Sequence, residues 1–279
     1  MTDPSRRRVV VGVDGSTESR TALRLAVDEA RYRNCPLQIV RSVEMYEENP
    51  ESEELDSAVA FVRDDLGFTE VSGLVTSGFP AMALLEQAAD AELVVVGSRP
   101  RSAIASVVLG SVGSAVATHA PCPVIVARTS GERATPGARV VVGVDGSDVS
   151  ERAVDFAFGE ASHRGTGLVA VHCWQVDHPA AARWDAEAFA TRRNEHLRWM
   201  SESLAGFQDK YPEVQVTTSL LEGRPAVLLT ELSRGAGLVV VGSRGRGGLV
   251  GMLLGSVSQS LLHHAYCSIA VVRPVVPSS

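Results

Sequence analysis

A stretch near the start of the chain recurs in its middle, so one folding unit is present twice. Residues 6–18 read Arg-Arg-Arg-Val-Val-Val-Gly-Val-Asp-Gly-Ser-Thr-Glu, and residues 137–149 read Gly-Ala-Arg-Val-Val-Val-Gly-Val-Asp-Gly-Ser-Asp-Val. The 279 residues suit two domains of about 140 residues each, close to the usual domain size. We predict a first domain over residues 1–130, a Gly- and Pro-rich linker over 131–138, and a second domain over 139–279.

Each copy alternates short apolar runs with helical stretches. The apolar runs are Val9–Val13, Leu37–Val40, Val71–Thr76, Leu93–Val96 and Val124–Ala127, then Val140–Val144, Leu168–Val171, Val214–Leu220, Leu238–Val241 and Ile269–Val272. Continuous β-branched runs are typical of strands covered on both faces, and connections too long for hairpins indicate right-handed crossovers. The sequence therefore predicts an α/β protein with two tandem doubly wound, Rossmann-like domains, each holding a five-stranded parallel sheet.

The second crossover differs between the copies. In the second copy an apolar helix face is expected from Phe189, Leu197, Met200, Leu204 and Phe207. The first copy has an acidic stretch at 44–56 and room only for a shorter helix. Both tryptophans of the longer segment, Trp184 and Trp199, are expected to pack against the domain or an interface.

Composition narrows the partners and the location. A net charge of −7 argues against nucleic acid or an anionic membrane as a partner. No early apolar signal region and no apolar run of about 20 residues is present, so we expect a cytoplasmic protein without a membrane span. The four cysteines form no CxxC pair and are expected to be reduced, and no metal site is predicted.

A glycine-rich loop follows the fourth strand of the second copy. Gly242-Ser-Arg-Gly245 is followed after nine residues by Gly255-Ser256, where a helix is expected to begin. Glycines admit an anion to backbone N–H groups, and a helix N-terminus supplies further donors and a favourable dipole. Ser256 and Ser258 add hydroxyls, Val257 lies between them, and Arg244 and Arg246 can offset phosphate charge. This segment predicts a phosphate site.

Asp145 ends the first strand of the second copy. In a doubly wound sheet this position lies beside the fourth strand, where the strand order reverses and ligands usually bind. Its carboxylate can accept hydrogen bonds from a ribose or a base. Asp14 and Asp145 can alternatively be turn carboxylates that cap the next helix together with Ser16 and Ser147. The glycines, likewise, can serve the turn alone.

Val-Gly-Val-Asp-Gly-Ser, the Gly-two-Gly-nine-Gly-Ser spacing and the final His-His-Ala before the last strand together resemble the universal stress protein family in its tandem, ATP-binding form. The resemblance covers nearly the whole chain. It implies strand order 3-2-1-4-5, pairing of domains through their fifth strands, and ATP held between Asp145 and the loop Gly242, Gly245, Gly255 and Ser256. The residue that contacts adenine through its backbone falls near Cys173.

The first copy departs from this pattern. It keeps Asp14, Gly97, Gly110 and Ser111, but Pro100 stands at the middle glycine. Proline removes a backbone donor and fixes φ near −65°. Gly113 also replaces the second serine. We therefore expect ATP at the second site, and weak or no binding at the first.

The resemblance implies an ATP-binding regulatory protein of the stress response. No catalytic nucleophile, general base or P-loop stands out, so nucleotide is expected to be sensed rather than consumed. The alternatives are a nucleotide-independent scaffold and a slow ATPase. Expected partners are ATP with Mg²⁺, an unidentified protein and a second copy of the chain.

Overall fold

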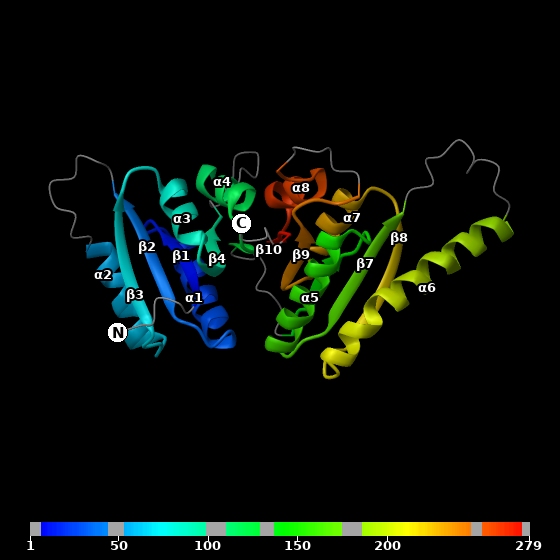
Figure 1. Ribbon diagram of the computed structural model, residues 1–279, viewed down its shortest axis with the longest axis horizontal. Helices are drawn as coiled ribbons and strands as arrows, with labels where there is room; N and C mark the ends of the chain where they lie inside the picture. Colours follow the sequence, from blue (N-terminus) through cyan, green and yellow to red (C-terminus); the bar gives the residue numbers. More distant parts are fainter. Residues whose placement is uncertain are drawn as a thin grey trace. The chain divides into compact units, whose positions relative to one another are not determined.

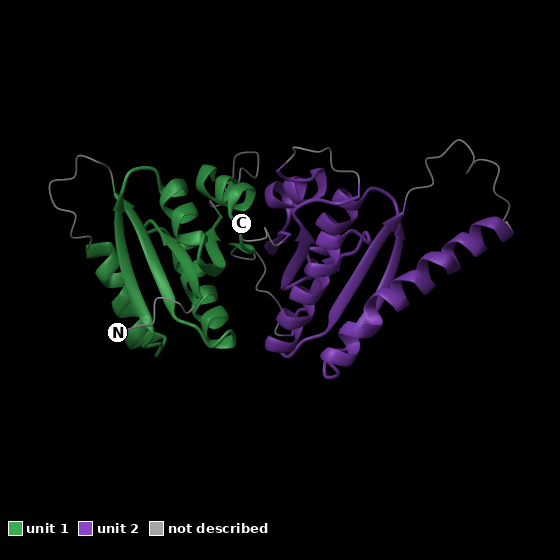
Figure 2. Ribbon diagram, viewed as in Figure 1, with its two compact units in different colours: residues 1–129, 275–279 green, residues 130–274 purple. Residues whose placement is uncertain are grey.

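The computed structural model describes residues 7–43, 53–98, 110–128, 137–174, 186–246 and 253–274. The chain divides into two compact units, with the boundary between Thr129 and Ser130 (Figure 2). Each unit holds one copy of the sequence repeat.

The first unit alternates strands and helices along the whole of its length (Figure 1). Its elements are β1 (Arg8–Val13), α1 (Thr17–Tyr32), β2 (Leu37–Val43), α2 (Glu53–Ala60) with the π-helical turn η1 (Phe61–Asp65), β3 (Val71–Ser77), α3 (Pro80–Ala88), β4 (Ala91–Gly97), α4 (Ser111–His119) and β5 (Val124–Ala127).

The second unit repeats this order with a longer second crossover. Its elements are β6 (Val140–Gly143), α5 (Asp148–His163), β7 (Leu168–Trp174), α6 (Ala186–Lys210), β8 (Val216–Glu222), α7 (Pro225–Leu232), β9 (Leu238–Gly242), α8 (Ser256–His264) and β10 (Ser268–Val272).

The strands within each unit are parallel and follow the predicted order 3-2-1-4-5. In the first unit the order is β3-β2-β1-β4-β5, and in the second it is β8-β7-β6-β9-β10. The first two helices of each unit contact one another on one face, α1 with η1 and α5 with α6, and the last two pack together on the other. The predicted fold class is confirmed. The pairing of the two fifth strands stays a prediction.

The central strands are buried on both faces, as their continuous β-branched runs predict. Val9, Val10 and Val11 of β1 are fully buried, and Val140 of β6 is too. Because side chains alternate along a strand, such a strand needs apolar residues at every position, and only a helix layer on each face can cover it.

The second crossover shows the predicted difference between the copies. Along α6, Met200 and Leu204 are buried, and the ring of Phe207 stacks on Phe158 of α5 with centroids 5.7 Å apart. The shorter α2 and η1 bury Leu55 and Val62. Trp184 lies outside the described residues.

Cys35, Cys122 and Cys267 are buried, Cys173 is partly buried, and no disulfide joins these four residues. That their thiols are reduced stays a prediction. In the described ranges, no helix combines the length and the apolar character that a membrane span requires.

Candidate functional site

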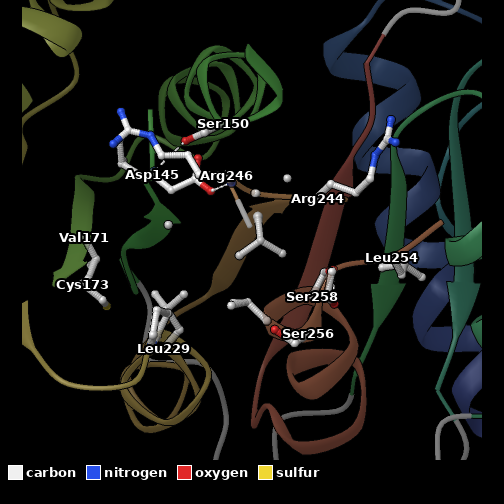
Figure 3. Close-up of a pocket in the computed structure, with 18 residues that line it drawn as sticks. Asp145, Ser150, Val171, Cys173, Leu229, Arg244, Arg246, Leu254, Ser256 and Ser258 are labelled. Atoms are coloured by element: carbon white, nitrogen blue, oxygen red, sulfur yellow. Dashed lines mark hydrogen bonds between the residues drawn. The ribbon is translucent and has the colours of Figure 1, made fainter. Parts of the chain in front are cut away.

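A cavity of about 370 Å³ opens at the carboxyl ends of β6 and β9, where the strand order of the second unit reverses (Figure 3). Its volume falls within the usual range for small-molecule sites, roughly 300 to 1,000 Å³. Every site residue predicted in the second copy lines it: Asp145, Cys173, Gly242, Arg244, Gly245, Gly255, Ser256, Val257 and Ser258. The structure thus brings together residues that are more than 100 positions apart in the chain.

One wall of the cavity is apolar. Val171 and Cys173 of β7 lie near Leu229 of α7 on this side of the cavity (Figure 3), and Pro225 also lines the cavity. Burial raises the pKa of the Cys173 thiol to about 11, so this wall stays uncharged near neutral pH. A flat apolar ring system suits such a surface better than a charged group does.

The opposite end of the cavity is formed by the N-terminus of α8. Gly255 is the N-cap residue and supplies no side-chain hydrogen bond to the first turn. The first turn of a helix has N–H groups without intrahelical partners and carries the positive end of the dipole. Ser256 begins the helix with its side chain exposed. This end can therefore receive an anion.

The three glycines of the loop serve different purposes. A Cβ at Gly242 would lie 3.0 Å from both Arg244 O and Val149 Cγ1, and a Cβ at Gly245 would clash with Asp145 Oδ2. A side chain at Gly242 would therefore press on its own domain, and one at Gly245 would displace the Asp145 carboxylate. A Cβ at Gly255 would meet its nearest neighbours, including Ser243 O, only at 3.5 Å, so the fold itself tolerates a side chain there.

Ser258 braces the loop against the helix. Its buried hydroxyl lies 3.1 Å from Ser243 O and 2.9 Å from Gly255 O, to either of which it can donate. The Gly255 N–H donates to Ser243 O at 2.7 Å. The Ser258 hydroxyl therefore has partners within the protein and holds the two ends of the loop together.

Asp145 is part of a hydrogen-bonded turn. Its Oδ1 accepts from the N–H of Ser147 at 2.9 Å and from its hydroxyl at 2.7 Å, and Ser147 caps α5. Its Oδ2 accepts from the N–H of Arg246 at 3.1 Å. The capping interpretation thus describes Oδ1, whereas Oδ2 joins the turn to the glycine loop.

The two arginines of the loop point in different directions. The guanidinium of Arg246 lies over the ring of Trp199 in α6, 5.4 Å from its centroid. The side chain of Arg244 extends away from the cavity (Figure 3). Only Arg246 therefore has a side chain held next to Asp145.

Sequence reasoning missed a group of aromatic side chains behind Asp145. His172 of β7 lies between His196 and Trp199 of α6, with ring centroids 5.0 Å from each. Alternation along β7 was the available signal, because residues 171 and 173 face the cavity and residue 172 must face the other way. The partners on α6 could not be read from it.

In the first unit, Asp14 repeats the turn of Asp145. Its Oδ1 accepts from the N–H and hydroxyl of Ser16 at 3.1 and 2.5 Å. Burial acts to raise the pKa of Asp14, but the hydrogen bonds from Ser16 and Ser19 outweigh it and hold the pKa below its usual value. Asp14 is therefore ionised at neutral pH and holds Ser16, the N-cap residue of α1.

The other predicted residues of the first unit take equivalent places. Gly97 ends β4, where a Cβ would lie 2.9 Å from the backbone of Glu18, and Gly110 caps α4, which begins at Ser111. Pro100 lies outside the described residues. A cavity of about 310 Å³ in this unit lies between α1 and α2, and none of the predicted residues lines it.

Among the residues described, no group of three or more His, Cys, Asp and Glu side chains could hold a metal ion. His263 and His264 end α8 with their rings 6.2 Å apart, and Cys267 is buried.

Together these features define a class, the tandem Rossmann-like α/β proteins with a cavity at the carboxyl ends of the central strands. The model of the Universal stress protein family matches residues 5–128 and 138–273. The chain belongs to this family, in its tandem form.

Relatives confirm this arrangement over the whole length. The chain is 38% identical to the universal stress protein Rv2005c of Mycobacterium tuberculosis, over 98% of this chain and 99% of the relative. It is 35% identical to a universal stress protein of Mycolicibacterium smegmatis, over 95% and 97%. A universal stress protein structure from Archaeoglobus fulgidus has the same fold, with TM-score 0.67 and 20% identity over 95% of this chain and 98% of that one.

Proposed function

We propose that this chain is an ATP-binding regulatory protein of the stress response, and that its second domain senses the nucleotide. The observation that carries the proposal is the cavity at the strand-order reversal. An apolar wall, a strand-end carboxylate and a helix N-terminus all line this one cavity. Ligands of doubly wound folds bind at this position.

The cavity suits the three parts of a nucleotide. The apolar wall of Val171 and Leu229 suits the base, and Asp145 suits the ribose. The space above Gly255, left open by the missing Cβ, suits the phosphates at the start of α8. Because the Arg246 N–H occupies Oδ2 of Asp145, a ribose would share or replace that bond.

Magnesium would come with the nucleotide. Mg²⁺ is usually held by one or two carboxylates together with phosphate oxygens and water. The described residues offer no cluster that would hold the ion alone, so the phosphates would supply most of its ligands.

Sensing is favoured over turnover because the cavity supplies no activated nucleophile. Both carboxylate oxygens of Asp145 already accept hydrogen bonds, and the raised pKa of Cys173 keeps its thiol protonated. We place the protein in the cytoplasm as part of the same proposal. A slow ATPase and a nucleotide-independent scaffold are the alternatives that the experiment separates.

The test is nucleotide content and titration of the full chain. Protein purified without added ligand is denatured, and the supernatant is analysed for nucleotide by mass spectrometry. Calorimetric titration with ATP and Mg²⁺ is expected to give about one tight site per chain, because the first loop lacks a glycine and a serine. No nucleotide and no binding would favour the scaffold, and two equal tight sites would contradict the asymmetry.

A pair of variants places the phosphates. Gly255→Ala is expected to weaken ATP binding by about 100-fold or more, roughly 2.7 kcal/mol, while the domain stays folded. Gly206→Ala is the matched control, because a Cβ at Gly206 in α6 meets nothing within 4 Å. Equal affinities of the two variants would refute the placement. Phosphate release above about 1 s⁻¹ under excess ATP would favour the enzyme.

A further inference from the structure

The two neighbours of Asp145 are both held by the aromatic side chains behind it. Nδ1 of His172 lies 2.7 Å from Val144 O. Since a carbonyl oxygen only accepts, Nδ1 carries the proton and donates. A Cβ on Gly146 would clash with Nη2 of Arg246 and would lie 2.5 Å from Cζ2 of Trp199, so both the guanidinium and the indole lie directly on Gly146. Residues 144 and 146 are therefore both fixed from the α6 side.

Arg246 adds a third contact to the same turn. Its backbone N–H donates to Asp145 Oδ2 at 3.1 Å, and its guanidinium lies over Trp199. A cation over an indole face is attracted by the ring quadrupole. Trp199 thus contacts both Gly146, which follows Asp145, and Arg246, whose N–H binds the Asp145 carboxylate.

His196 completes the group from α6. Its ring lies 5.0 Å from His172 and 5.3 Å from Trp174, centroid to centroid. Burial lowers the pKa of His196 below its ordinary 6.5, and the charges of His172, Arg192 and Arg246 act in the same direction, opposed by Glu195. A proton on His196 therefore introduces a charge into a partly buried site that already faces cations.

The sign of the pH dependence follows from this lowered pKa. The unfolded or undocked state takes up a proton near pH 6.5, and the docked state resists it. The docking of α6 against the turn is therefore fully stable above about pH 6.5 and loses stability as pH falls through the pKa of the docked state.

We propose that His172 and Trp199 are positioning residues for Asp145, and that protonation of His196 loosens them, so that nucleotide affinity of the second domain falls with acidification. This inference rests on the proposed function, since it concerns the same site. The proton acts behind the turn, on the side from which Trp199 and His172 hold it. Protonated His196 also attracts phosphates at the start of α8. This attraction is expected to be weaker than the repulsion between His196 and Arg246, because the phosphates lie farther away and solvent screens the charges.

In the described part of the first domain, other side chains stand behind the equivalent turn. Arg41 stands at the position of His172, and its guanidinium forms an ion pair with Glu54 of α2. A carboxylate oxygen of Glu54 would lie 3.1 Å from a Cβ on Gly15, so Glu54 takes the place that Trp199 holds at Gly146. An arginine–glutamate ion pair therefore stands where the second domain has histidine and indole rings.

The coupling is tested first without nucleotide. The backbone amide signals of Gly146 and Gly15 are followed by NMR between about pH 7.5 and about pH 5.5, with His196→Gln and the exposed His264→Gln as matched variants. Gly146 is expected to follow a single titration that His196→Gln abolishes and His264→Gln leaves in place, and Gly15 is expected to shift little. A Gly146 signal that ignores pH, or titrates identically in His196→Gln, would overturn the proposal.

Affinity is then measured as a ratio. The ATP molecule takes up a proton in the same pH range, but this affects wild type and His196→Gln equally, so the ratio of their dissociation constants isolates the protein. Wild type is expected to lose about three- to tenfold more affinity than His196→Gln on acidification. A constant ratio, or wild-type affinity that rises relative to the variant, would refute the coupling.

A second pair tests positioning by His172. His172→Asn keeps an N–H near Val144 O and is expected to retain more ATP affinity than His172→Leu, which cannot donate. Equal loss in both variants would assign His172 to packing alone. If wild type binds no ATP at any pH, the proposed function fails, whereas the ligand-free measurement at Gly146 still decides whether the cluster senses protons.

Discussion

The two domains share one fold but differ in the side chains that pack around the turn after their first strand, at Asp14 and at Asp145. Asp14 with Ser16 and Asp145 with Ser147 make the same hydrogen bonds and cap equivalent helices. Behind the turn, the first domain has an arginine–glutamate ion pair, and the second has an aromatic and histidine cluster. The strand-end aspartate is thus explained by the fold in both copies.

The glycines of the two loops also differ in how closely neighbouring atoms surround them. Gly97 and Gly242 end equivalent strands, and a side chain at either would press against the first helix of its domain. Gly255 is free of that constraint, because its nearest neighbours lie at 3.5 Å. The comparison teaches that packing accounts for Gly97 and Gly242 but not for Gly255, at which contact with a ligand stays a prediction.

The largest effect is expected from removing a side chain against which α6 packs. Phe158→Ala should destabilise the second domain by about 3 to 5 kcal/mol, because this fully buried ring stacks on Phe207 and Tyr211. Chemical denaturation of the full chain should then show the second domain unfolding well before the first. A single transition shifted by less than about 1 kcal/mol would contradict the dependence of α6 on this contact.

The next prediction attempts to repair the first domain. Pro100→Gly with Gly113→Ser restores the middle glycine and the second serine of the phosphate-loop pattern, and should strengthen ATP binding there by about tenfold or more. Calorimetry should change from about one to two sites per chain. Unchanged stoichiometry would mean that other features, such as the shorter α2, close the first site.

Alanine at two equivalent glycines tests how firmly the side chains behind Asp145 are held. Gly15 and Gly146 both have φ of +76°, so alanine at either position is strained by about 1 to 2 kcal/mol. Gly146→Ala would also displace the guanidinium of Arg246 and the indole of Trp199, and should cost roughly 1 kcal/mol more than Gly15→Ala in denaturation. Equal losses would show that both side chains move aside at little cost.

The smallest effect concerns acid stability of the first domain. Because hydrogen bonds hold the pKa of Asp14 below its ordinary value, its contribution is present above about pH 4 and is lost as pH falls through the lowered pKa. Ser16→Ala should raise that pKa, as measured by NMR of the carboxyl carbon. A pKa that is unchanged in the variant would show that Ser16 does not stabilise the carboxylate.

Much of the fold could be predicted from the sequence because its signals are local. Continuous β-branched runs predict every strand to within a few residues, and the start of α8 at Ser256 follows from the glycine loop. The aromatic cluster could not be predicted, since His172 and His196 are brought together by a crossover whose path depends on packing. The opposite directions of Arg244 and Arg246 were equally hidden, as they share one loop.

The sequence alone determined that there are two domains, which follows from its repetition, and it predicted part of the cavity lining from the glycine loop and the strand-end aspartate. The strand order was implied only by the family resemblance. Only the tertiary structure decided which of those residues the protein needs for its own packing, such as Gly242 and Ser258, and which are left open to a ligand, such as Gly255. That distinction depends on contacts between distant segments, which no local pattern encodes.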